Sequence, residues 1–259
     1  MTRSFPLFLA LAALAAPAAA GPAPEPAPKA VSKPSAKSLP PAAFTSGPVR
    51  ADARRLAELI MPEDLYLSFM ERAVIAGIEQ NKEEFAELDQ EHPGLVDALA
   101  AKLGKVGRDH AREQLGVTYD RYARAFASHF TAADIGQLSD FYRSRIGQKI
   151  IVGKFAGLDL SPLLDKFAQD PDAAITEGDI SDLNKDAVGK LFQHLDRSDF
   201  AALFTFMRTP AFKSLNAFTP TMLALEAQIA SEPDPELDAK LERAVAEVMG
   251  RFSVGSETS

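Results

Sequence analysis

FTAADIGQLSDFYRSRIGQKI, residues 130–150, is the stretch that decides the fold, and it predicts a capped helix, a sharp corner and a second helix. Thr131 and Asp134 have capping-box spacing, so each side chain can accept a hydrogen bond from the backbone amide of the other residue. Ser144 is placed to cap the second helix. Apolar residues follow the two caps at helical spacing: Ile135, Leu138, Phe141 and Tyr142, then Ile146, Ile150, Ile151 and Phe155.

A degenerate copy of this stretch begins 65 residues later as LDRSDFAALFTFMRTPAFKSL, residues 195–215. At this offset five residues are identical: His129, Asp134, Leu138, Phe141 and Arg143 match His194, Asp199, Leu203, Phe206 and Arg208. Asp196 replaces Thr131 as the N-cap residue, and Thr209 replaces Ser144 just before Pro210, where proline is tolerated at a helix start. We interpret the match as a duplication, with repeats over residues 105–165 and 182–230; the alternative is two ordinary helix pairs that converged on the same caps.

The first copy resembles the bacterial family called domain of unknown function 2059. The resemblance is carried by Phe130, Thr131, Asp134, Phe141, Tyr142, Ser144 and Gly147 and covers residues 105–165. The chain departs from the family pattern at Arg145, where the family usually has proline; the second copy has the proline, Pro210, but Phe212 in place of the glycine. The resemblance implies an exported, all-helical protein and no assigned activity.

The N-terminus has the three parts of a secretory signal peptide in residues 1–20: Arg3, an apolar run from Phe5 to Ala16, and small residues before a cleavage site between Ala20 and Gly21. Residues 21–48 contain eight of the eighteen prolines and predict a disordered Pro/Ala/Lys linker. Residues 49–255 are predicted to form the helical domain. No later run reaches the length of a membrane span, so we expect no stable span after cleavage and a periplasmic or secreted location.

Charge divides the chain into a basic linker and an acidic body. The whole chain carries −8, whereas residues 49–259 carry −11, because Arg3 and three linker lysines outweigh Glu25. An acidic body argues against nucleic-acid binding, which favours a basic face. The linker is expected to be a solvated spacer, with contact to anionic lipid or cell wall as the alternative. The absence of cysteine excludes disulfides, thiol catalysis and a lipoprotein anchor.

The body reads as helix throughout, without the period-two alternation of strands. Pro62 and Pro93 mark two helix starts, and a long apolar stripe runs from Leu95 to Phe130. Gly104, Gly107 and Gly116 fall within this stripe and predict a bend or break. Acidic residues at 170–179 are expected to separate the two copies, and the acids at 182–186 to lie at a helix start. The last helix is predicted from Leu237 to Phe252. The fold class is therefore an all-α helical bundle.

Residues suited to chemistry are few. The four histidines, His92, His110, His129 and His194, show no spacing typical of metal ligands. Asp182, Asn184 and Asp186 have calcium-loop spacing, but the sixth and twelfth positions are Ala187 and Gln193 rather than Gly and Glu, which excludes an EF-hand. Asp134 and Asp199 are explained as caps. We therefore predict no catalytic, cofactor-binding or metal-binding residues.

Two functions remain open from the sequence. The first is a non-enzymatic binding or structural module of the cell envelope, whose partner is a protein, a peptide or a lipid-like ligand. The alternative is a cell-envelope hydrolase with an unrecognised active site, for which His129, His194 and the acidic connector at 170–179 are the supporting features. Self-association into a homo-oligomer through an apolar helix edge is a third expectation.

Overall fold

The computed structural model describes residues 48–80, 86–170 and 173–255, and these residues form helices joined by short connections, with no strand among them. The predicted signal peptide, its cleavage site and the linker up to residue 47 lie outside the described residues. The helices are α1 (Ala51–Ile60), α2 (Glu63–Gln80), α3 (Ala86–Glu91), α4 (Leu95–His129), α5 (Ala132–Arg143), α6 (Arg145–Gly157), α7 (Ser161–Gln169), α8 (Glu177–Phe192), α9 (Arg197–Met207), α10 (Pro210–Ser231) and α11 (Pro235–Gly255). The all-α prediction is confirmed.

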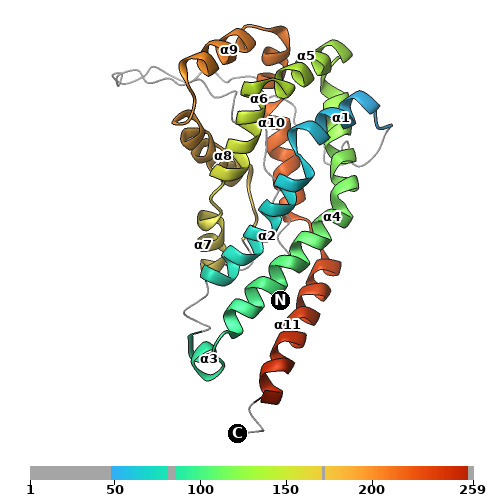
Figure 1. The fold of residues 1–259 in the computed structure, drawn as a ribbon. Helices are drawn as coiled ribbons and strands as arrows, with labels where there is room; N and C mark the ends of the chain where they lie inside the picture. The colour runs from blue at the N-terminus through green and yellow to red at the C-terminus, as the bar shows by residue number, and fades with distance from the viewer. Residues whose placement is uncertain (1–47, 81–85, 171–172, 256–259) are drawn as a thin grey trace, which may run out of the picture.

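The long helix α4 packs against more helices than any other element. α1, α2 and α11 lie along it, and α10 touches it near its C-terminal end (Figure 1). Its buried residues include Leu115, Tyr119, Tyr122 and Phe126, the stripe that the sequence predicted. The Tyr119 hydroxyl donates a 2.9 Å hydrogen bond to the carbonyl of Met61, which fixes the corner between α1 and α2.

The prediction that glycines break α4 is wrong, because the helix is continuous over 35 residues. Gly107 instead allows α2 to approach closely. A Cβ atom built at Gly107 would lie 2.7 Å from Cγ2 of Val74, a distance that real side chains do not tolerate. Gly104 and Gly107 are therefore explained by close packing of α2 on α4, whereas an added Cβ at Gly116 would meet nothing within 4 Å.

Two helix pairs follow α4 and are built alike. The first helix pair is α5 and α6; the second is α9 and α10. Capping boxes begin α5 and α9, through Thr131 with Asp134 and through Asp196 with Asp199, as predicted. Ser144 and Thr209 cap the second helix of each pair.

Each helix pair places its second helix on the first helix of the other pair: α10 lies on α5, and α6 lies on α9. The contact is centred on Phe141 and Phe206, whose rings stack at 3.7 Å with an angle of 8° between their planes. These two phenylalanines hold the same position in the two helix pairs. The helix pairs are therefore related by an approximate two-fold arrangement at their contact.

The connection before the second helix pair differs from the prediction. The acids at 177–179 do not separate the copies but form the first turn of α8, which is capped by Thr176 and Asp179. The acids at 182–186 consequently lie inside α8 rather than at its start. The sequence does contain the signal for this helix start, since Thr176 and Asp179 have the same spacing as Thr131 and Asp134.

The corner between α5 and α6 should depend on Gly147. A Cβ atom there would lie 2.1 Å from the carbonyl oxygen of Phe141 and 2.5 Å from Cα of Tyr142, and both are backbone atoms that cannot move aside. We expect Gly147→Ala to lower the free energy of unfolding by at least ~1–3 kcal/mol, as measured by urea denaturation.

Gly136→Ala is the matched control, since Gly136 is exposed on α5 with nothing within 4 Å of its added Cβ. Alanine is the better helix former, so this variant should be neutral or gain up to ~1 kcal/mol. Equal losses in the two variants would contradict the role assigned to the corner.

Candidate functional site: the groove between α4 and α11

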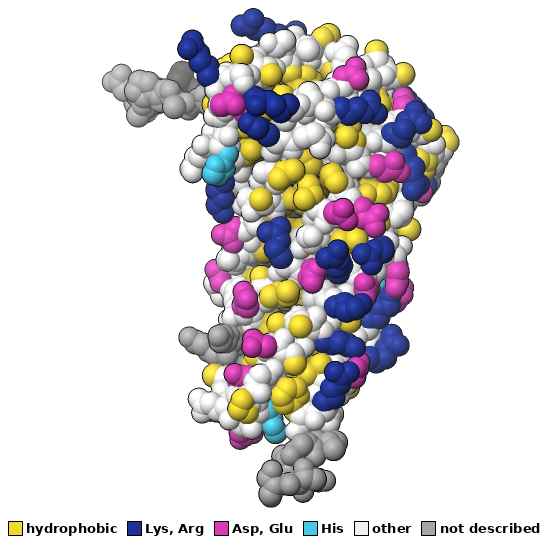
Figure 2. Space-filling view, viewed as in Figure 1, with side chains coloured by type: hydrophobic (Ala, Val, Ile, Leu, Met, Phe, Trp, Pro, Cys, Tyr) yellow, Lys and Arg dark blue, Asp and Glu magenta, His cyan; other side chains and the backbone are white. Residues whose placement is uncertain are grey.

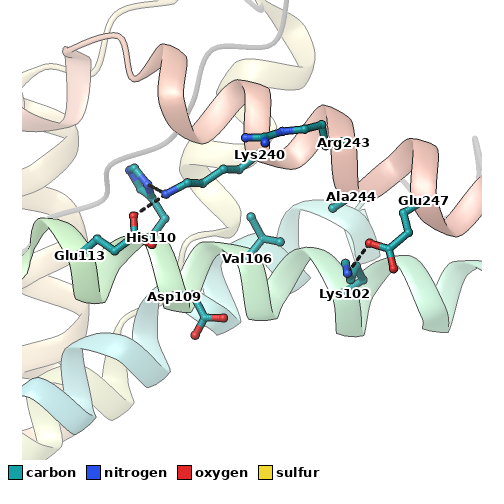
Figure 3. Close-up of a pocket in the computed structure, with 9 residues that line it drawn as sticks. All are labelled: Lys102, Val106, Asp109, His110, Glu113, Lys240, Arg243, Ala244 and Glu247. Atoms are coloured by element: carbon teal, nitrogen blue, oxygen red, sulfur yellow. Dashed lines mark hydrogen bonds and ion pairs between the residues drawn. The ribbon is translucent and has the colours of Figure 1, made fainter.

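α4 and α11 leave a groove between them, with a volume of about 320 Å³ (Figure 3). Leu95, Leu99 and Val248 close one end of the helix contact as a small apolar cluster. The groove itself is lined by Lys102, Val106, Asp109, His110, Glu113, Lys240, Arg243, Ala244 and Glu247. Most of these side chains are charged, and both signs are present, so the groove offers paired donors and acceptors rather than an apolar surface.

His110 lies at the inner end of the groove and is only 4% exposed. Its Nε2 lies 2.6 Å from Oδ2 of Asp234, and its Nδ1 lies 3.2 Å from Nζ of Lys240. An ammonium group can only donate, so Nδ1 accepts and Nε2 carries the proton that it donates to Asp234. Asp234 is itself held in place, because its Oδ1 accepts the backbone N–H of Leu237 at the start of α11.

Lys240 lies at the centre of the charged groups. Its Nζ bonds to Glu113 and lies 2.9 Å from Oε1 of Glu236 (Figure 3 shows the bonds to Glu113 and His110). Hydrogen bonding to Glu113 and then to Glu236 raises the pKa of Lys240 above its usual range. The ammonium group therefore stays charged and bridges α11 to α4.

His110, Glu113 and Glu236 also place one ligand atom each within 4.8 Å of one another, which is the spacing of a metal site. The ammonium group of Lys240 bonds to all three residues, so a divalent ion could bind there only if Lys240 moved away. The geometry is that of an ion-pair network built around a protein cation.

A second hollow of about 180 Å³ lies on the other side of His110, towards α2 and the end of α10. Arg121 crosses it with two hydrogen bonds to Glu232, of 2.6 and 2.7 Å. A bidentate pair of this kind fixes the guanidinium plane. The junction between α10 and α11 is thus tied to α4 by Arg121 with Glu232 and by His110 with Asp234.

The structure places the two histidines that could support the hydrolase hypothesis in different surroundings. His129 is at the end of α4, where its Nε2 lies 3.1 Å from the carbonyl oxygen of Ser214 and its ring packs against Phe218. His194 is exposed in the turn after α8. The alternative role, packing at a helix junction with a bond to the backbone, is confirmed for His129.

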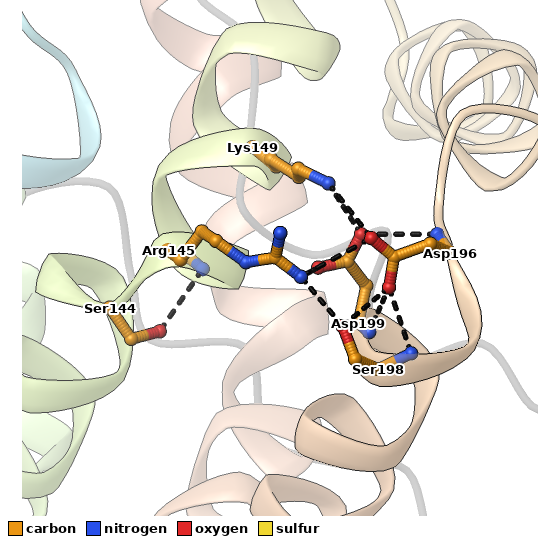
Figure 4. Close-up of polar contacts among 7 residues, drawn as sticks. Ser144, Arg145, Lys149, Asp196, Ser198 and Asp199 are labelled. Atoms are coloured by element: carbon orange, nitrogen blue, oxygen red, sulfur yellow. Dashed lines mark hydrogen bonds and ion pairs between the residues drawn. The ribbon is translucent and has the colours of Figure 1, made fainter.

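Charged side chains also join the two helix pairs (Figure 4). From the first turns of α6, Arg145 bonds to Oδ1 of Asp199 at 2.7 Å and Lys149 bonds to Oδ2 at 2.6 Å. The Asp199 side chain is fully buried and also completes the capping box of α9. Arg145, the residue that departs from the family pattern, therefore anchors the second helix pair.

The equivalent contact, from α10 to the capping box of α5, is weaker. Ser214, 65 residues after Lys149, donates to Oδ1 of Asp134 at 3.4 Å. Pro210, at the position of Arg145, has no group to donate. The two helix pairs therefore exchange polar contacts reciprocally, with charges on one side and a hydroxyl on the other.

Three polar side chains, those of Tyr122, Glu226 and Lys154, are buried in the interior of the fold. The Tyr122 hydroxyl of α4 donates a 3.1 Å hydrogen bond to Glu226 of α10, which is fully buried. Lys154 of α6 is also buried, and burial lowers its pKa to about 8, against the opposing effect of the Glu226 charge. Sequence periodicity could not reveal these contacts, because the three residues come from three helices that meet only in the fold.

Asp199 should make folding sensitive to acid. Bonding to Lys149 lowers the pKa of Asp199 below its ordinary 3.8, so its contribution is present above that pH and is lost as the pH falls further. We expect Asp199→Asn to unfold at lower urea concentration at pH 7 and to lose less stability than the parent chain as the pH falls below 3.8.

Asp134→Asn is the matched control for this test. It removes the same cap bond in the first helix pair, and no cation among the described residues pairs with Asp134. Its loss of stability at pH 7 should be the smaller of the two. Identical urea curves for the two variants from pH 7 to pH 3 would contradict the ion-pair account.

Lys154 should act in the opposite pH range. Because its pKa falls from 10.5 to about 8 on folding, the unfolded chain binds more protons between these values, and stability should rise with pH there. The rise amounts to roughly 2–3 kcal/mol up to about pH 10, at 1.36 kcal/mol per pKa unit. Lys154→Met should remove this rise in urea unfolding measured at pH 8 to 10, whereas the half-buried Lys149→Met should keep it.

Neither a curated protein nor a solved structure matches the chain. The family resemblance drawn from the sequence, by contrast, is confirmed over the segment that carries it. Residues 119–153, which span the end of α4, the whole of α5 and the start of α6, match the family described as "Uncharacterized protein conserved in bacteria (DUF2059)".

Proposed function

We propose that the protein is a non-enzymatic binding or structural module of the cell envelope, and that the groove between α4 and α11 holds a peptide-like ligand. The observation that supports the proposal is the hydrogen bonding of the titratable side chains in the groove. Both ring nitrogens of His110 are bonded, one to Asp234 and one to Lys240, and Lys240 is bonded to two carboxylates. Groups held in this way recognise a ligand better than they transfer a proton to it.

The chemistry of the groove favours a peptide over a lipid-like ligand. Lys102, Lys240 and Arg243 face Asp109, Glu113 and Glu247 across it, and only Val106 and Ala244 are apolar. A peptide carries donors, acceptors and charges of both signs, whereas an acyl chain would leave these groups without solvent. Figure 2 shows the same mixture on one face of the molecule, where Lys and Arg side chains lie among Asp and Glu side chains along its length.

A periplasmic or secreted location is part of the proposal. It is supported by the signal-peptide pattern of residues 1–20 and by the family resemblance. None of the described helices combines the length and the apolar character needed to cross a bilayer.

We also propose that the two helix pairs arose by duplication. Support comes from the shared capping boxes 65 residues apart, from the stack of the equivalent residues Phe141 and Phe206, and from the reciprocal contacts of α10 with α5 and α6 with α9. Convergence on common caps would account for the first observation but not for the other two.

The cell-envelope hydrolase is the second candidate, on one observation. The 2.6 Å contact between His110 and Asp234 resembles the orienting half of a catalytic triad. The other ring nitrogen, however, faces the ammonium group of Lys240 and not a hydroxyl. If the protein hydrolyses envelope material, His110→Gln, which keeps an N–H donor towards Asp234, should abolish that activity while circular dichroism shows that the helices are retained.

The binding proposal predicts that groove residues control ligand affinity. Synthetic peptides of mixed charge should raise the melting temperature of the full chain, and Arg243→Ala should weaken their binding by about tenfold or more, equivalent to ~1.4 kcal/mol, in isothermal titration calorimetry. Arg243 is suited to the test because its Nε bonds within its own helix, to the carbonyl of Ala239, so its loss should not unfold the protein.

Arg251→Ala is the control on the same helix, since Arg251 pairs with Glu247 from outside the groove. It should leave peptide affinity within about twofold, because an exposed pair contributes little. Failure of every peptide to bind, or equal weakening by the two variants, would remove the support for a binding groove.

A further inference from the structure

An aromatic surface is left uncovered on the second helix pair. Phe204 of α9 is 57% exposed, Phe192 of α8 is 37% exposed, and Phe200 between them is half-buried. The rings form a ladder, with centroids 6.0 Å apart from Phe192 to Phe200 and 6.5 Å apart from Phe200 to Phe204. We call these three residues the phenylalanine ladder. A contiguous exposed apolar patch, unlike single scattered apolar residues, is typical of an interaction site.

The first helix pair shows what covers the equivalent surface. The residues 65 positions earlier than Phe200 and Phe204 are Ile135 and Ser139, and both are buried. α1 packs against both α4 and α5 (Figure 1). α9, by contrast, packs chiefly against α6 and α10, and among the described helices no counterpart of α1 lies on it. The fold therefore contains one covered and one uncovered version of the same surface.

The contacts of α1 show which features a helix needs in order to cover this surface. Its buried stripe consists of Ala53, Leu56, Ala57 and Ile60. Arg50, one turn before the stripe, donates a 3.1 Å hydrogen bond to the carbonyl of Phe130, which ends α4. Arg54 pairs with Asp120 of α4. The hydrogen bond from Arg50, the apolar stripe and the ion pair between Arg54 and Asp120 therefore hold α1 in place.

The second helix pair has counterparts for both polar contacts. The carbonyl of Leu195, 65 residues after Phe130, receives no hydrogen bond from the described residues. Lys185 replaces Asp120, so the sign of the charge is reversed; within the described part of the chain it pairs with Asp182 of its own helix, and both side chains are exposed. The surface thus offers an acceptor for a cation and a cation for an acid.

We propose that the phenylalanine ladder binds an amphipathic helix of another polypeptide. Its partner carries a basic residue, apolar residues three, six, seven and ten positions later, and an acid four positions after the basic residue to meet Lys185. This inference rests on the proposed binding role and on the duplication, and it adds a second surface and a partner of stated chemistry.

The size of the surface agrees with a single helix. A stable dimer buries about 800 Å² on each partner. A phenylalanine buries about 150–250 Å² in total, and the rings of the ladder are already partly covered. Two copies joined through the ladder alone would bury too little, whereas one helix needs only a narrow apolar stripe.

Two labelled peptides test the proposal against the full chain by fluorescence anisotropy. The first has the sequence of residues 49–62; the second is the same peptide with Arg54→Glu, which supplies the acid for Lys185. We expect the second peptide to bind more tightly than the first. Phe204→Ser should weaken its binding by about tenfold or more, and Lys185→Glu should reverse the preference between the peptides.

Val245→Ser, which removes an exposed apolar side chain on α11, is the control and should leave binding unchanged. Because Phe204, Lys185 and Val245 are all exposed, the variants should keep the parent melting temperature. Lack of saturable binding by either peptide, or binding that Phe204→Ser does not weaken, would overturn the proposal. So would a dimer in light scattering, or sedimentation with anionic phospholipid vesicles, that Phe204→Ser abolishes.

The result for the phenylalanine ladder can be distinguished from the result for the groove between α4 and α11. Arg243→Ala should leave the anisotropy titration unchanged, since it lies on α11. If mixed-charge peptides bind the groove but neither helix peptide binds the ladder, the binding role survives and the inference about the second surface fails.

Discussion

The stack of Phe141 on Phe206 is the contact on which the packing of the two helix pairs is centred. The rings are nearly parallel at 3.7 Å, although aromatic pairs favour offset or edge-to-face geometry. The packing around them explains the geometry: each phenylalanine lies on the first helix of a pair, and the second helix of the other pair lies across it. The apolar faces of the two helix pairs are buried partly by each other and partly by neighbouring helices, since α1 packs on α5 and α8 packs on α6 and α10.

Ion pairs join particular helices of this protein to one another. Residues 49–259 carry −11, yet several cations of the body are placed where they join helices that are distant in sequence. Lys240 joins α11 to α4, Arg121 joins the end of α10 to α4, and Arg145 with Lys149 joins the two helix pairs. Buried or partly buried pairs of this kind are costly to break, because one charge would remain without its partner. They therefore specify which helices meet.

The two proposed binding surfaces differ in the physics on which they depend. The groove between α4 and α11 is lined by charges that already satisfy one another, so a ligand there has to exchange bonds with them. The phenylalanine ladder gains by removing apolar rings from water. One surface should accordingly respond to salt much more strongly than the other, which gives a physical distinction between partners of the two sites.

Sequence alone determined the class of fold, the helix starts and the matching internal design of the two helix pairs. Caps and apolar spacing are local features that depend on residues three or four apart, so the roles of Thr131, Asp134, Asp196 and Asp199 follow from the local sequence. The helix start at Thr176 has the same spacing, but the acidic residues around it also suit a connector, and the prediction of a connector there is wrong.

Only the tertiary structure decided which helices touch, and hence where the candidate sites lie. Lys240 is 130 residues from His110, and nothing in the local pattern of either residue points to the other. The same holds for Gly107, whose missing Cβ is explained by Val74 on another helix, and for the ladder, whose exposure depends on the lack of a counterpart to α1 among the described helices. Local sequence sets backbone geometry through hydrogen bonds within a turn, whereas a site is made by side chains that meet only after the helices have packed.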